Sequence, residues 1–339
     1  MSTSLVIQTS FLGDAVLTTP LLSQLANRGA VDVVPTPAAA ALLVNHPAVR
    51  TVIPYDKHDA ERGLIGLWRL ARRLRVTRYD VAILAQGSWR SAALALLAGI
   101  PSRIGFNTSA GRLLYTKRVK YRADLHHAAR LLMLARPNGR APTEDELRPS
   151  LVPGQAERVA VDALLGERTS RGDALVALAP GSIWGTKRWP FYPELARALA
   201  DVAQIVIVGS ETDAPLGAAV SDAAPGAVDA TGRLSLLASA ELIGRCRVLV
   251  TNDSAPMHLA SAMGTPTVAI FGPTVPDFGF GPLAPRSVVL GHDALPCRPC
   301  DRHGPHRCPL GHHRCMRDLP PNLVAERVRA LLLSRDVVA

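Results

Sequence analysis

The sequence predicts an α/β protein built from two doubly wound domains. Short apolar, β-branched runs alternate with helical stretches along the chain, and this rhythm restarts after Arg171, beyond a polar stretch from Ala141 to Asp173. Strands that are apolar throughout are typical of parallel sheets covered by helices on both faces. A length of 339 residues also favours two domains over one.

The first series predicts a domain over residues 1–165. Its predicted strands are Leu5–Thr9, Val31–Val34 and Asp80–Leu84, and its predicted helices are Ala15–Asn27 and Ser88–Ala98. The stretch Glu61–Arg75 also has helical spacing, because Leu64, Leu67, Trp68 and Ala71 recur every three or four residues.

The second series predicts a domain over residues 174–320 and a last helix. Its predicted elements are the strands Ala174–Ala179, Ala203–Val208, Val248–Thr251 and Val268–Phe271 and the helix Tyr192–Asp201. Asn322–Ser334 is an amphipathic helix, and we expect residues 321–339 to pack back on the first domain. Ligands of doubly wound sheets bind at the carboxyl ends of the strands, so we expect a cleft shared by the two domains.

The net charge of +10 lies entirely in the first half of the chain. Residues 1–160 contain 21 Lys and Arg against 11 Asp and Glu, whereas residues 161–339 contain 17 of each. This asymmetry favours an anionic partner, although arginines on a solvated face are the alternative. Aromatic residues are only 4% of the chain and are not interleaved with the basic ones, which argues against nucleic acid.

Composition and the N-terminus predict a cytoplasmic protein. No apolar run approaches the ~20 residues that cross a bilayer. Asp14 interrupts the first apolar stretch, where a signal peptide needs an unbroken apolar core. The five cysteines do not form the pattern of a disulfide framework.

Three segments at predicted strand ends carry residues suited to chemistry. In Gln8–Pro20, Asp14 follows a glycine-containing turn, where a carboxylate either caps the helix or accepts a proton from an attacking hydroxyl. In Ala179–Pro190, a glycine-rich loop carries Lys187 and Arg188, a pair that suits a diphosphate but is more often only solvated.

The third segment, Thr251–Gly264, takes a strand directly into a helix. Asn252, Asp253 and Ser254 are its expected capping residues, and His258 falls on the next turn. Free amides and the partial positive charge of a helix N-terminus suit a leaving diphosphate. The alternative is an ordinary capped helix, but the position of this segment at a strand end favours a ligand site.

Together these segments resemble the heptosyltransferase family of bacterial outer-membrane assembly, over essentially the whole chain. The motifs are Gly13-Asp14…Thr19-Pro20, Lys187-Arg188-Trp189-Pro190, Thr251-Asn252-Asp253-Ser254…His258, Gly272-Pro273-Thr274 and Pro276-Asp277-Phe278. The second and last look most like the branch that adds the second heptose. The resemblance implies two Rossmann-like domains in the GT-B arrangement. It also implies an inverting transfer of L-glycero-D-manno-heptose from ADP-heptose to the heptosyl-Kdo2-lipid A inner core of lipopolysaccharide.

The resemblance implies roles for individual residues. Asp14 would be the general base for the acceptor hydroxyl. The acceptor carries phosphorylated lipid A and anionic keto-sugars and so needs cations around Asp14. The candidate acceptor-binding residues are therefore Arg62, Arg69 and Lys120, with Ser10 and Gly13 beside Asp14. The donor would be bound by Ser182, Lys187, Arg188, Asp253, Ser254, Ala255 and His258, and its nucleoside by either Glu211 or Asp213. The chain has no Asp-x-Asp pair, so we expect no cofactor for the chemistry, with Lys187 and Arg188 in place of a metal.

An anionic, lipid-borne acceptor would explain the positive charge of the first half of the chain. Glu61–Arg75 either rests on a membrane surface or packs on the sheet with its arginines in water. We therefore expect a cytoplasmic enzyme associated peripherally with the inner membrane. The alternatives are heptosyltransferase I, transfer to a protein or another glycan, an inactive scaffold and, more distantly, a nucleic-acid-binding protein. The presence of Asp14, Lys187 and Asp253 argues against a scaffold.

Four cysteines crowd into residues 297–315, namely Cys297, Cys300, Cys308 and Cys315. Such a group predicts a structural zinc or iron site, with His303, His306, His312 and His313 as alternative ligands. The spacings are not those of common zinc fingers, so four reduced thiols are the alternative. A related branch of heptosyltransferases carries a four-cysteine iron-binding finger.

Overall fold

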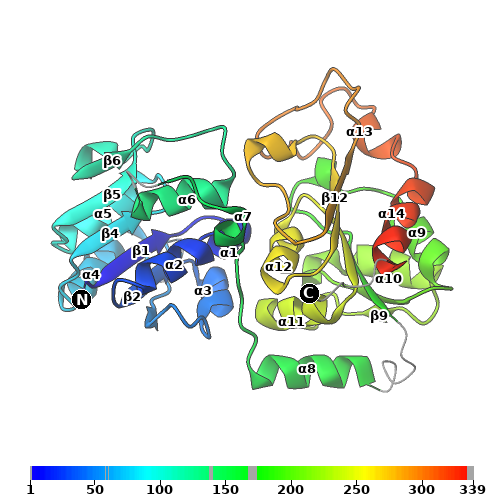
Figure 1. The fold of residues 1–339 in the computed structure, drawn as a ribbon, viewed down its shortest axis with the longest axis horizontal. Coiled ribbons are helices and arrows are strands. Elements are labelled where there is room, and N and C mark those ends of the chain that lie inside the picture. Colours follow the sequence, from blue (N-terminus) through cyan, green and yellow to red (C-terminus); the bar gives the residue numbers. More distant parts are fainter. Residues whose placement is uncertain (1, 58, 60, 137–139, 167–173, 334–339) are drawn as a thin grey trace. The chain divides into compact units, whose positions relative to one another are not determined.

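The computed structural model describes residues 2–57, 59, 61–136, 140–166 and 174–333. The chain divides into two compact units, Met1–Val152 and Pro153–Ala339. Each unit contains a six-stranded parallel sheet with helices on both faces (Figure 1). The predicted class of two doubly wound α/β domains is therefore confirmed.

The first sheet has the strand order β3-β2-β1-β4-β5-β6. The strands are β1 Ser4–Gln8, β2 Val31–Pro35, β3 Thr51–Val52, β4 Val81–Leu84, β5 Ser102–Phe106 and β6 Lys117–Val119. Every residue of β1 and β2 is buried, as expected for strands covered on both faces. The strands β3, β5 and β6 were not predicted, because they are short or carry polar and partly exposed residues.

Helices cover both faces of the first sheet. They are α1 Leu12–Leu17, α2 Thr19–Ala26, α3 Pro37–Leu43, α4 Gly63–Arg75, α5 Trp89–Leu97, α6 His127–Ala135, α7 Glu144–Leu147 and the 3-10 turn η1 Arg112–Leu114. The helices α4 and α5 pack together on one face, whereas α1, α2, α3 and α6 contact one another on the other. The predicted helix Ala15–Asn27 is two helices that meet at Thr18, because Pro20 has no N–H to continue the hydrogen-bond ladder of α1.

The second sheet has the order β12-β11-β10-β7-β8-β9. Its strands are β7 Leu175–Ala179, β8 Gln204–Ile207, β9 Val228–Asp229, β10 Val248–Asn252, β11 Thr267–Phe271 and β12 Ser287–Gly291. Its helices are α8 Gln155–Leu165, α9 Tyr192–Leu199, α10 Ala214–Ala223, α11 Leu236–Arg245, α12 Ala255–Met263, α13 Arg314–Arg317 and α14 Pro321–Leu333, with 3-10 turns η3 Gly185–Lys187, η4 Glu211–Asp213 and η5 Pro276–Phe278.

Two domain boundaries differ from those predicted. The first unit ends at Val152 rather than at residue 165, because α8 packs on α11 of the second unit. Arg245 supports this contact with an ion pair to Asp162, at 2.5 Å. Residues 167–173, at the end of the predicted separating stretch, lie outside the described residues.

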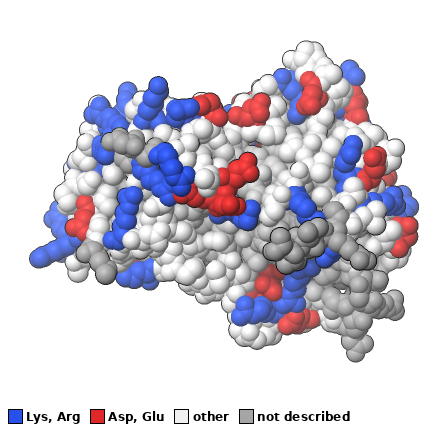
Figure 2. Space-filling model, viewed as in Figure 1, with Lys and Arg blue, Asp and Glu red and all other residues white. Residues whose placement is uncertain are grey.

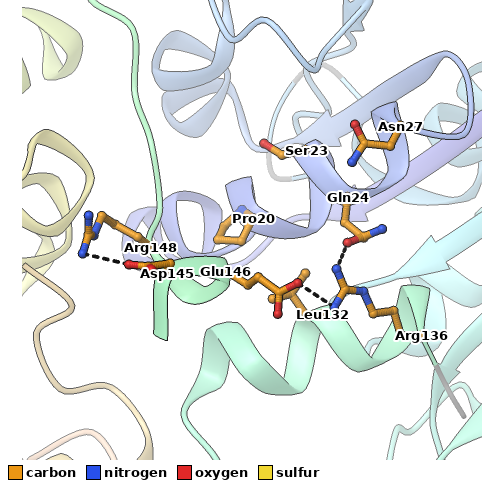
Figure 3. Close-up of a pocket in the computed structure, with 9 residues that line it drawn as sticks. All are labelled: Pro20, Ser23, Gln24, Asn27, Leu132, Arg136, Asp145, Glu146 and Arg148. Atoms are coloured by element: carbon orange, nitrogen blue, oxygen red, sulfur yellow. Dashed lines mark hydrogen bonds and ion pairs between the residues drawn. The ribbon is translucent and has the colours of Figure 1, made fainter. Parts of the chain in front are cut away.

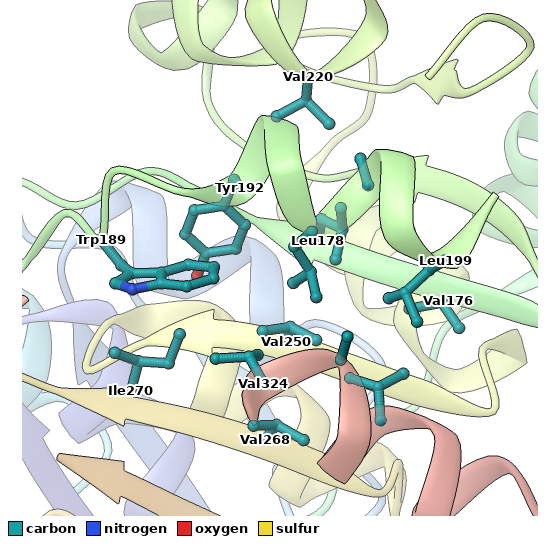
Figure 4. Close-up of a cluster of buried hydrophobic side chains, with 14 of the residues drawn as sticks. Val176, Leu178, Trp189, Tyr192, Leu199, Val220, Val250, Val268, Ile270 and Val324 are labelled. Atoms are coloured by element: carbon teal, nitrogen blue, oxygen red, sulfur yellow. The ribbon is translucent and has the colours of Figure 1, made fainter. Parts of the chain in front are cut away.

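The C-terminal helix belongs to the second unit. We expected it to return to the first domain, but α14 packs on α9, β10 and β11. Its buried residues Val324, Ala325 and Val328 complete the core on that face of the sheet (Figure 4). Burial of this apolar stripe stabilises the second unit. The predicted continuation through residues 334–339 lies outside the described residues.

Each sheet has one point where the strand order reverses. In the first sheet it lies between β1 and β4, and in the second between β7 and β10. Because β1 and β4 are parallel, as are β7 and β10, the loops that leave them start at the same edge of their sheet. Ligands of doubly wound sheets bind at such points. Among the described residues, no helix combines the length and the apolar character needed to span a bilayer.

Candidate active site

Asp14 lies at the reversal point of the first sheet, in the first turn of α1. Its Oδ2 accepts a hydrogen bond from the Ser10 hydroxyl at 2.6 Å and another from the backbone N–H of Phe11 at 3.3 Å. Through the bond from the Phe11 N–H, Asp14 caps the start of α1, which was one of the two roles expected for it from the sequence. The side chain is 15% exposed, so the carboxylate is held in place and still reaches solvent, as a general base requires.

His127 is a neighbour of Asp14 that the sequence pattern did not indicate. Its Nε2 lies 3.4 Å from Asp14 Oδ1, and its side chain is 14% exposed. His127 is the first residue of α6. That helix follows β6, so its first turn lies at the carboxyl edge of the sheet. Because β6 was not predicted, no local signal pointed to this histidine.

The predicted acceptor-binding residues do not all lie together. Ser10 and Gly13 are on the turn that carries the candidate base, and Lys120 directly follows β6 at the same edge. Arg62 precedes α4, which also starts at this edge because it follows β3. Arg69 is on the exposed side of α4, about two turns farther from the edge. The structure therefore brings four of these five residues to the carboxyl edge.

The start of α4 is tied to the turn that carries Asp14. Lys57 Nζ donates a hydrogen bond to the carbonyl of Thr9 at 3.0 Å. The guanidinium of Arg90, at the start of α5, donates to the carbonyls of Glu61 and Gly63 at 3.0 and 2.8 Å. These bonds hold the loop before α4 beside the end of β1.

A cavity of about 320 Å³ lies elsewhere in the first unit, between α2, α6 and α7 (Figure 3). Arg136 crosses it and contacts Gln24 and, at 3.0 Å, Glu146. None of the predicted site residues lines this cavity. We therefore do not assign it to the chemistry.

In the second unit, Lys187 is held against Asp253. The Lys187 Nζ lies 2.5 Å from Asp253 Oδ2, and the two side chains are only 10% and 11% exposed. The hydroxyl of Thr274 donates to the same Oδ2 at 2.7 Å. Lys187 is therefore not a solvated loop charge. Its ammonium has three N–H donors, and Asp253 takes one, so the remainder suit a bound anion.

The loop after β7 also folds on itself. Arg188 Nε donates to the carbonyl of Ser182 at 2.9 Å, and the Ser182 hydroxyl accepts from the backbone N–H of Trp184 at 3.3 Å. Ser182 and Arg188 are thus in contact, and Lys187 precedes Arg188 in the chain; the diphosphate role of these residues stays a prediction.

Asn252 joins the loops that leave β7 and β10. This residue is completely buried at the end of β10. Its Nδ2 donates to the carbonyl of Pro180 at 2.9 Å, while its Oδ1 accepts from the Trp189 backbone N–H at 3.1 Å and the Tyr192 hydroxyl at 3.3 Å. The Asn252 side chain thus links the loop after β7 to the end of β10 and is not the helix cap predicted from the sequence.

The N-terminus of α12 faces the same reversal point. Its N-cap, Ser254, makes no side-chain cap bond, and Asp253 is engaged with Lys187 rather than with the helix. The amides of the first turn are therefore not consumed by a side-chain cap. Ser254 and Ala255 are partly exposed, and His258 is buried one turn farther on. This arrangement suits an anion at the helix N-terminus.

Glu211 and Asp213 differ in what their carboxylates do. Asp213 is buried, and its Oδ2 accepts from the backbone N–H and the hydroxyl of Ser210 at 2.9 and 2.7 Å. Its carboxylate also packs on Gly181, where an added Cβ would come within 2.4–2.5 Å. Glu211 is exposed. The Asp213 carboxylate is therefore occupied by contacts within the protein, whereas the Glu211 side chain is exposed to solvent.

The four clustered cysteines lie in the loop between β12 and α14. Burial raises the pKa of the Cys315 thiol to about 11, with a contribution from the neighbouring thiols. Burial and the Cys297 and Cys308 thiols also raise the pKa of Cys300. The thiols thus influence one another, but no group of three or more His, Cys, Asp or Glu in the described part of the chain is arranged to hold a metal ion. The zinc or iron site stays a prediction, and we derive no step through it.

Comparison with known proteins shows which family the chain resembles. Residues 67–308 match the model of glycosyltransferase family 9 (heptosyltransferase). The chain is 30% identical to lipopolysaccharide heptosyltransferase 2 of Escherichia coli, over 98% of this chain and 99% of that one. It is 29% identical to lipopolysaccharide heptosyltransferase 1 of Pseudomonas aeruginosa, again over 98% and 99%.

A solved structure gives the same relationship. The E. coli ADP-heptose lps heptosyltransferase II structure matches with a TM-score of 0.78 and 29% identity, over 98% of this chain and 99% of that one. The match spans nearly the whole of both chains, so it includes both doubly wound units. The chain therefore belongs to glycosyltransferase family 9, the heptosyltransferases, and is a glycosyltransferase.

Proposed function

We propose that this chain moves L-glycero-D-manno-heptose from ADP-heptose to the heptosyl-Kdo2-lipid A inner core of lipopolysaccharide. Two observations carry the proposal together. Asp14, a carboxylate that is 15% exposed, lies at the reversal point of one sheet, and Lys187, a buried cation, lies at that of the other. The E. coli relative and the E. coli structure, both named as the second heptosyltransferase, support the same branch.

In the proposed mechanism, Asp14 accepts the proton of the acceptor hydroxyl. The acceptor oxygen forms a bond to C1 of the donor heptose while the bond from C1 to the diphosphate breaks on the opposite face, so the configuration inverts. Negative charge builds on the departing ADP. Lys187, Arg188 and the amides at the start of α12 stabilise this charge, and fixed donors of this kind contribute several kcal/mol to lowering a barrier.

We assign the nucleoside contact to Glu211 and not to Asp213. The Asp213 carboxylate is already hydrogen-bonded to Ser210 and packed on Gly181, whereas Glu211 is exposed after β8. Ser182, Asp253, Ser254, Ala255 and His258 complete the proposed donor site. In this scheme Lys187 and Arg188 neutralise the diphosphate without a cofactor.

The test is ADP release by the purified protein with ADP-heptose and defined acceptors. We expect release that depends on heptosyl-Kdo2-lipid A, and a loss of kcat of about 10²–10⁴-fold in Asp14→Asn with ADP affinity retained. Asp124→Asn, an exposed carboxylate in the same unit, is the matched control. Release with Kdo2-lipid A alone would instead indicate transfer of the first heptose. ADP-heptose binding without release on either acceptor would contradict the proposed acceptor.

We also propose that the enzyme works at the cytoplasmic surface of the inner membrane, with the start of α4 in contact with the lipid. Leu67, Leu70 and Leu74 are buried in the core against the sheet, in agreement with the alternative that this helix packs on the sheet. A second apolar set stays exposed, however, with Leu64, Ile65 and Trp68 exposed by 73%, 68% and 51%. This set lies at the end of α4 that is tied beside Asp14.

The charge around α4 suits an anionic lipid surface. Between Arg62 and Arg78 the chain carries six arginines and no acidic residue. The guanidinium of Arg72 lies 4.8 Å from the centroid of the Trp68 ring. Cations near an anionic leaflet contribute about 1 kcal/mol each, and a buried large apolar side chain adds about 1.5–3 kcal/mol.

Vesicle flotation tests this placement. We expect the wild type to float with anionic vesicles, and the triple variant Leu64→Ser, Ile65→Ser, Trp68→Ser to remain in the dense fraction. The same variant should keep wild-type kcat on a deacylated, water-soluble acceptor. The control is Val44→Ser with Val159→Ser, two exposed apolar residues elsewhere. Equal flotation of wild type and triple variant would remove α4 from the membrane contact.

A further inference from the structure

We infer that the cysteine- and histidine-rich loop, residues 292–319, is a bracket that positions the Lys187–Asp253 pair for the donor diphosphate. The inference rests on the donor role proposed above for this pair. The bracket loop contacts both segments that hold the pair, namely the end of the loop after β7 and the turn after β11. His313 acts on the first segment and Arg298 on the second.

His313 holds the segment that ends in Lys187. Its Nε2 lies 2.8 Å from the backbone carbonyl of Thr186, the residue before the lysine. A carbonyl only accepts hydrogen bonds, so Nε2 carries the proton in this contact. The Thr186 hydroxyl in turn donates to the carbonyl of Pro305. One residue of the donor loop is thus bonded twice to the bracket loop.

Ring contacts support the same segment. The Trp184 ring is a neighbour of two histidine rings of the bracket loop, with centroid distances of 6.1 Å to His303 and 4.7 Å to His306. At Gly304 the loop comes so close that an added Cβ would lie 3.4 Å from Lys187 Cε. The bracket loop therefore passes close to the Lys187 side chain.

His313 has a backbone conformation that most residues avoid. It adopts φ 50° and ψ 31°, and among the described residues only Arg78 shares a positive φ without being glycine. Its N–H lies 3.4 Å from Cys308 Sγ, an additional tie within the loop. Left-handed backbone in a non-glycine residue is unfavourable and persists where surrounding contacts hold it. In this conformation the His313 ring reaches the Thr186 carbonyl.

Arg298 holds the segment that supports Asp253. Its side chain is only 5% exposed. The guanidinium donates to the carbonyls of Phe271, Gly272 and Thr274 at 3.1, 2.5 and 3.2 Å. The Thr274 hydroxyl donates to Asp253 Oδ2. The two arms of the bracket loop thus converge on the same ion pair, from the lysine side and from the aspartate side.

The test compares His313→Ala, His313→Gln and the control His312→Ala. His313→Ala should weaken ADP affinity and raise the KM for ADP-heptose by about five- to tenfold, the loss typical of one hydrogen bond, with the acceptor KM unchanged. His313→Gln places a donor nitrogen where Nε2 was and should restore most of the ADP affinity. His312, whose Nδ1 accepts a hydrogen bond from the Arg314 N–H within the loop at 3.0 Å, should be neutral.

ADP titration by calorimetry, well below the unfolding temperature of each variant, separates positioning from stability. Lys187→Ala is measured beside them. If Lys187→Ala loses ADP affinity while His313→Ala keeps it, the bracket inference fails and the donor site stands. If His313→Gln is as weak as His313→Ala, the hydrogen bond is not the cause and the inference also fails. If Lys187→Ala binds ADP normally, the proposed donor site itself fails.

Discussion

At the scale of single residues, the contact between His127 and Asp14 has a direct consequence for rate. A proton on Nε2, which faces Asp14 Oδ1 at 3.4 Å, interacts favourably with the carboxylate and fixes its orientation. A hydrogen bond formed from His127 Nε2 to this charged group would contribute about 1.5–3 kcal/mol. We therefore predict that His127→Ala lowers kcat by about ten- to a hundredfold and leaves ADP affinity unchanged.

A double-mutant cycle checks this prediction. Steady-state kinetics are compared for wild type, Asp14→Asn, His127→Ala and the double variant. Groups that act as a unit give strongly non-additive losses, so the double variant should be little worse than Asp14→Asn. Additive losses would show that His127 acts independently of the candidate base.

Asp32, the second residue of β2, is a buried carboxylate that the proposed chemistry does not use. Arg50 donates to both of its oxygens at 2.9 and 2.6 Å, and the Tyr79 hydroxyl donates at 2.6 Å. Burial by itself would raise the pKa of Asp32. The bonds from Arg50 and Tyr79 outweigh that effect and lower the pKa below its ordinary value. The group is a stability element of the first unit.

Stability should therefore fall in acid. A carboxyl whose pKa is lowered on folding stabilises the fold above its unfolded pKa, and this contribution is lost as the pH falls through the folded pKa. We predict that Asp32→Asn lowers the free energy of unfolding by about 1–3 kcal/mol at pH 7, a range that allows for the partial exposure of Arg50. The difference from wild type should shrink below about pH 4. Urea unfolding at pH 3, 5 and 7 measures it, and a constant difference would contradict the assignment.

At the scale of elements, the strands near the middle of each sheet could be predicted, whereas the edge strands and β5 could not. The strands β1, β7, β10 and β11 are buried, largely apolar runs, and this pattern is sufficient to predict a strand. β6, with the sequence Lys-Arg-Val, is too short and too polar to produce such a pattern. Its absence from the prediction also hid His127, whose place depends on where that strand ends.

The candidate site divides in the same way. Lys187 and Asp253 could be found from motifs at strand ends, but their contact depends on the pairing of β7 with β10. His313 and Arg298 carried no local signal as positioning residues, because their partners belong to other elements. Sequence patterns thus indicate which residues have suitable chemistry, whereas tertiary contacts decide which of them act together.

The junction between β10 and α12 depends on Asn252. Asn252→Ala would leave the Pro180 carbonyl, the Trp189 N–H and the Tyr192 hydroxyl without this partner in a fully buried place. Unpaired buried polar groups cost about 1–3 kcal/mol each. We predict a loss of about 3 kcal/mol in the free energy of unfolding and a weaker ADP affinity. Chemical denaturation and ADP titration measure both, with the exposed Asn45→Ala as control. A neutral Asn252→Ala would show that the loops are held elsewhere.

At the scale of the whole molecule, charge is divided between the units. Residues 1–152 carry 20 Lys and Arg against 10 Asp and Glu, whereas residues 153–339 carry 18 of each. Figure 2 shows Lys and Arg side chains gathered over the part of the first unit that carries β5 and β6. A long-range attraction for an anionic acceptor therefore comes from the first unit. The proposed donor site of the second unit contains instead a few sheltered cations, such as Lys187.

Salt should then act differently on the two substrates. The Debye length is about 10 Å at 0.1 M salt and about 3 Å at 1 M, and exposed charges are screened much more than buried ones. Between 50 and 500 mM NaCl we predict that the KM for a deacylated, water-soluble acceptor rises about tenfold or more. The KM for ADP-heptose should rise only about two- to threefold, because Lys187 is nine-tenths buried. Initial rates across a salt series, repeated with potassium acetate to exclude a specific effect of chloride, measure both constants. Equal increases for the two substrates would show that the basic first unit does not attract the acceptor.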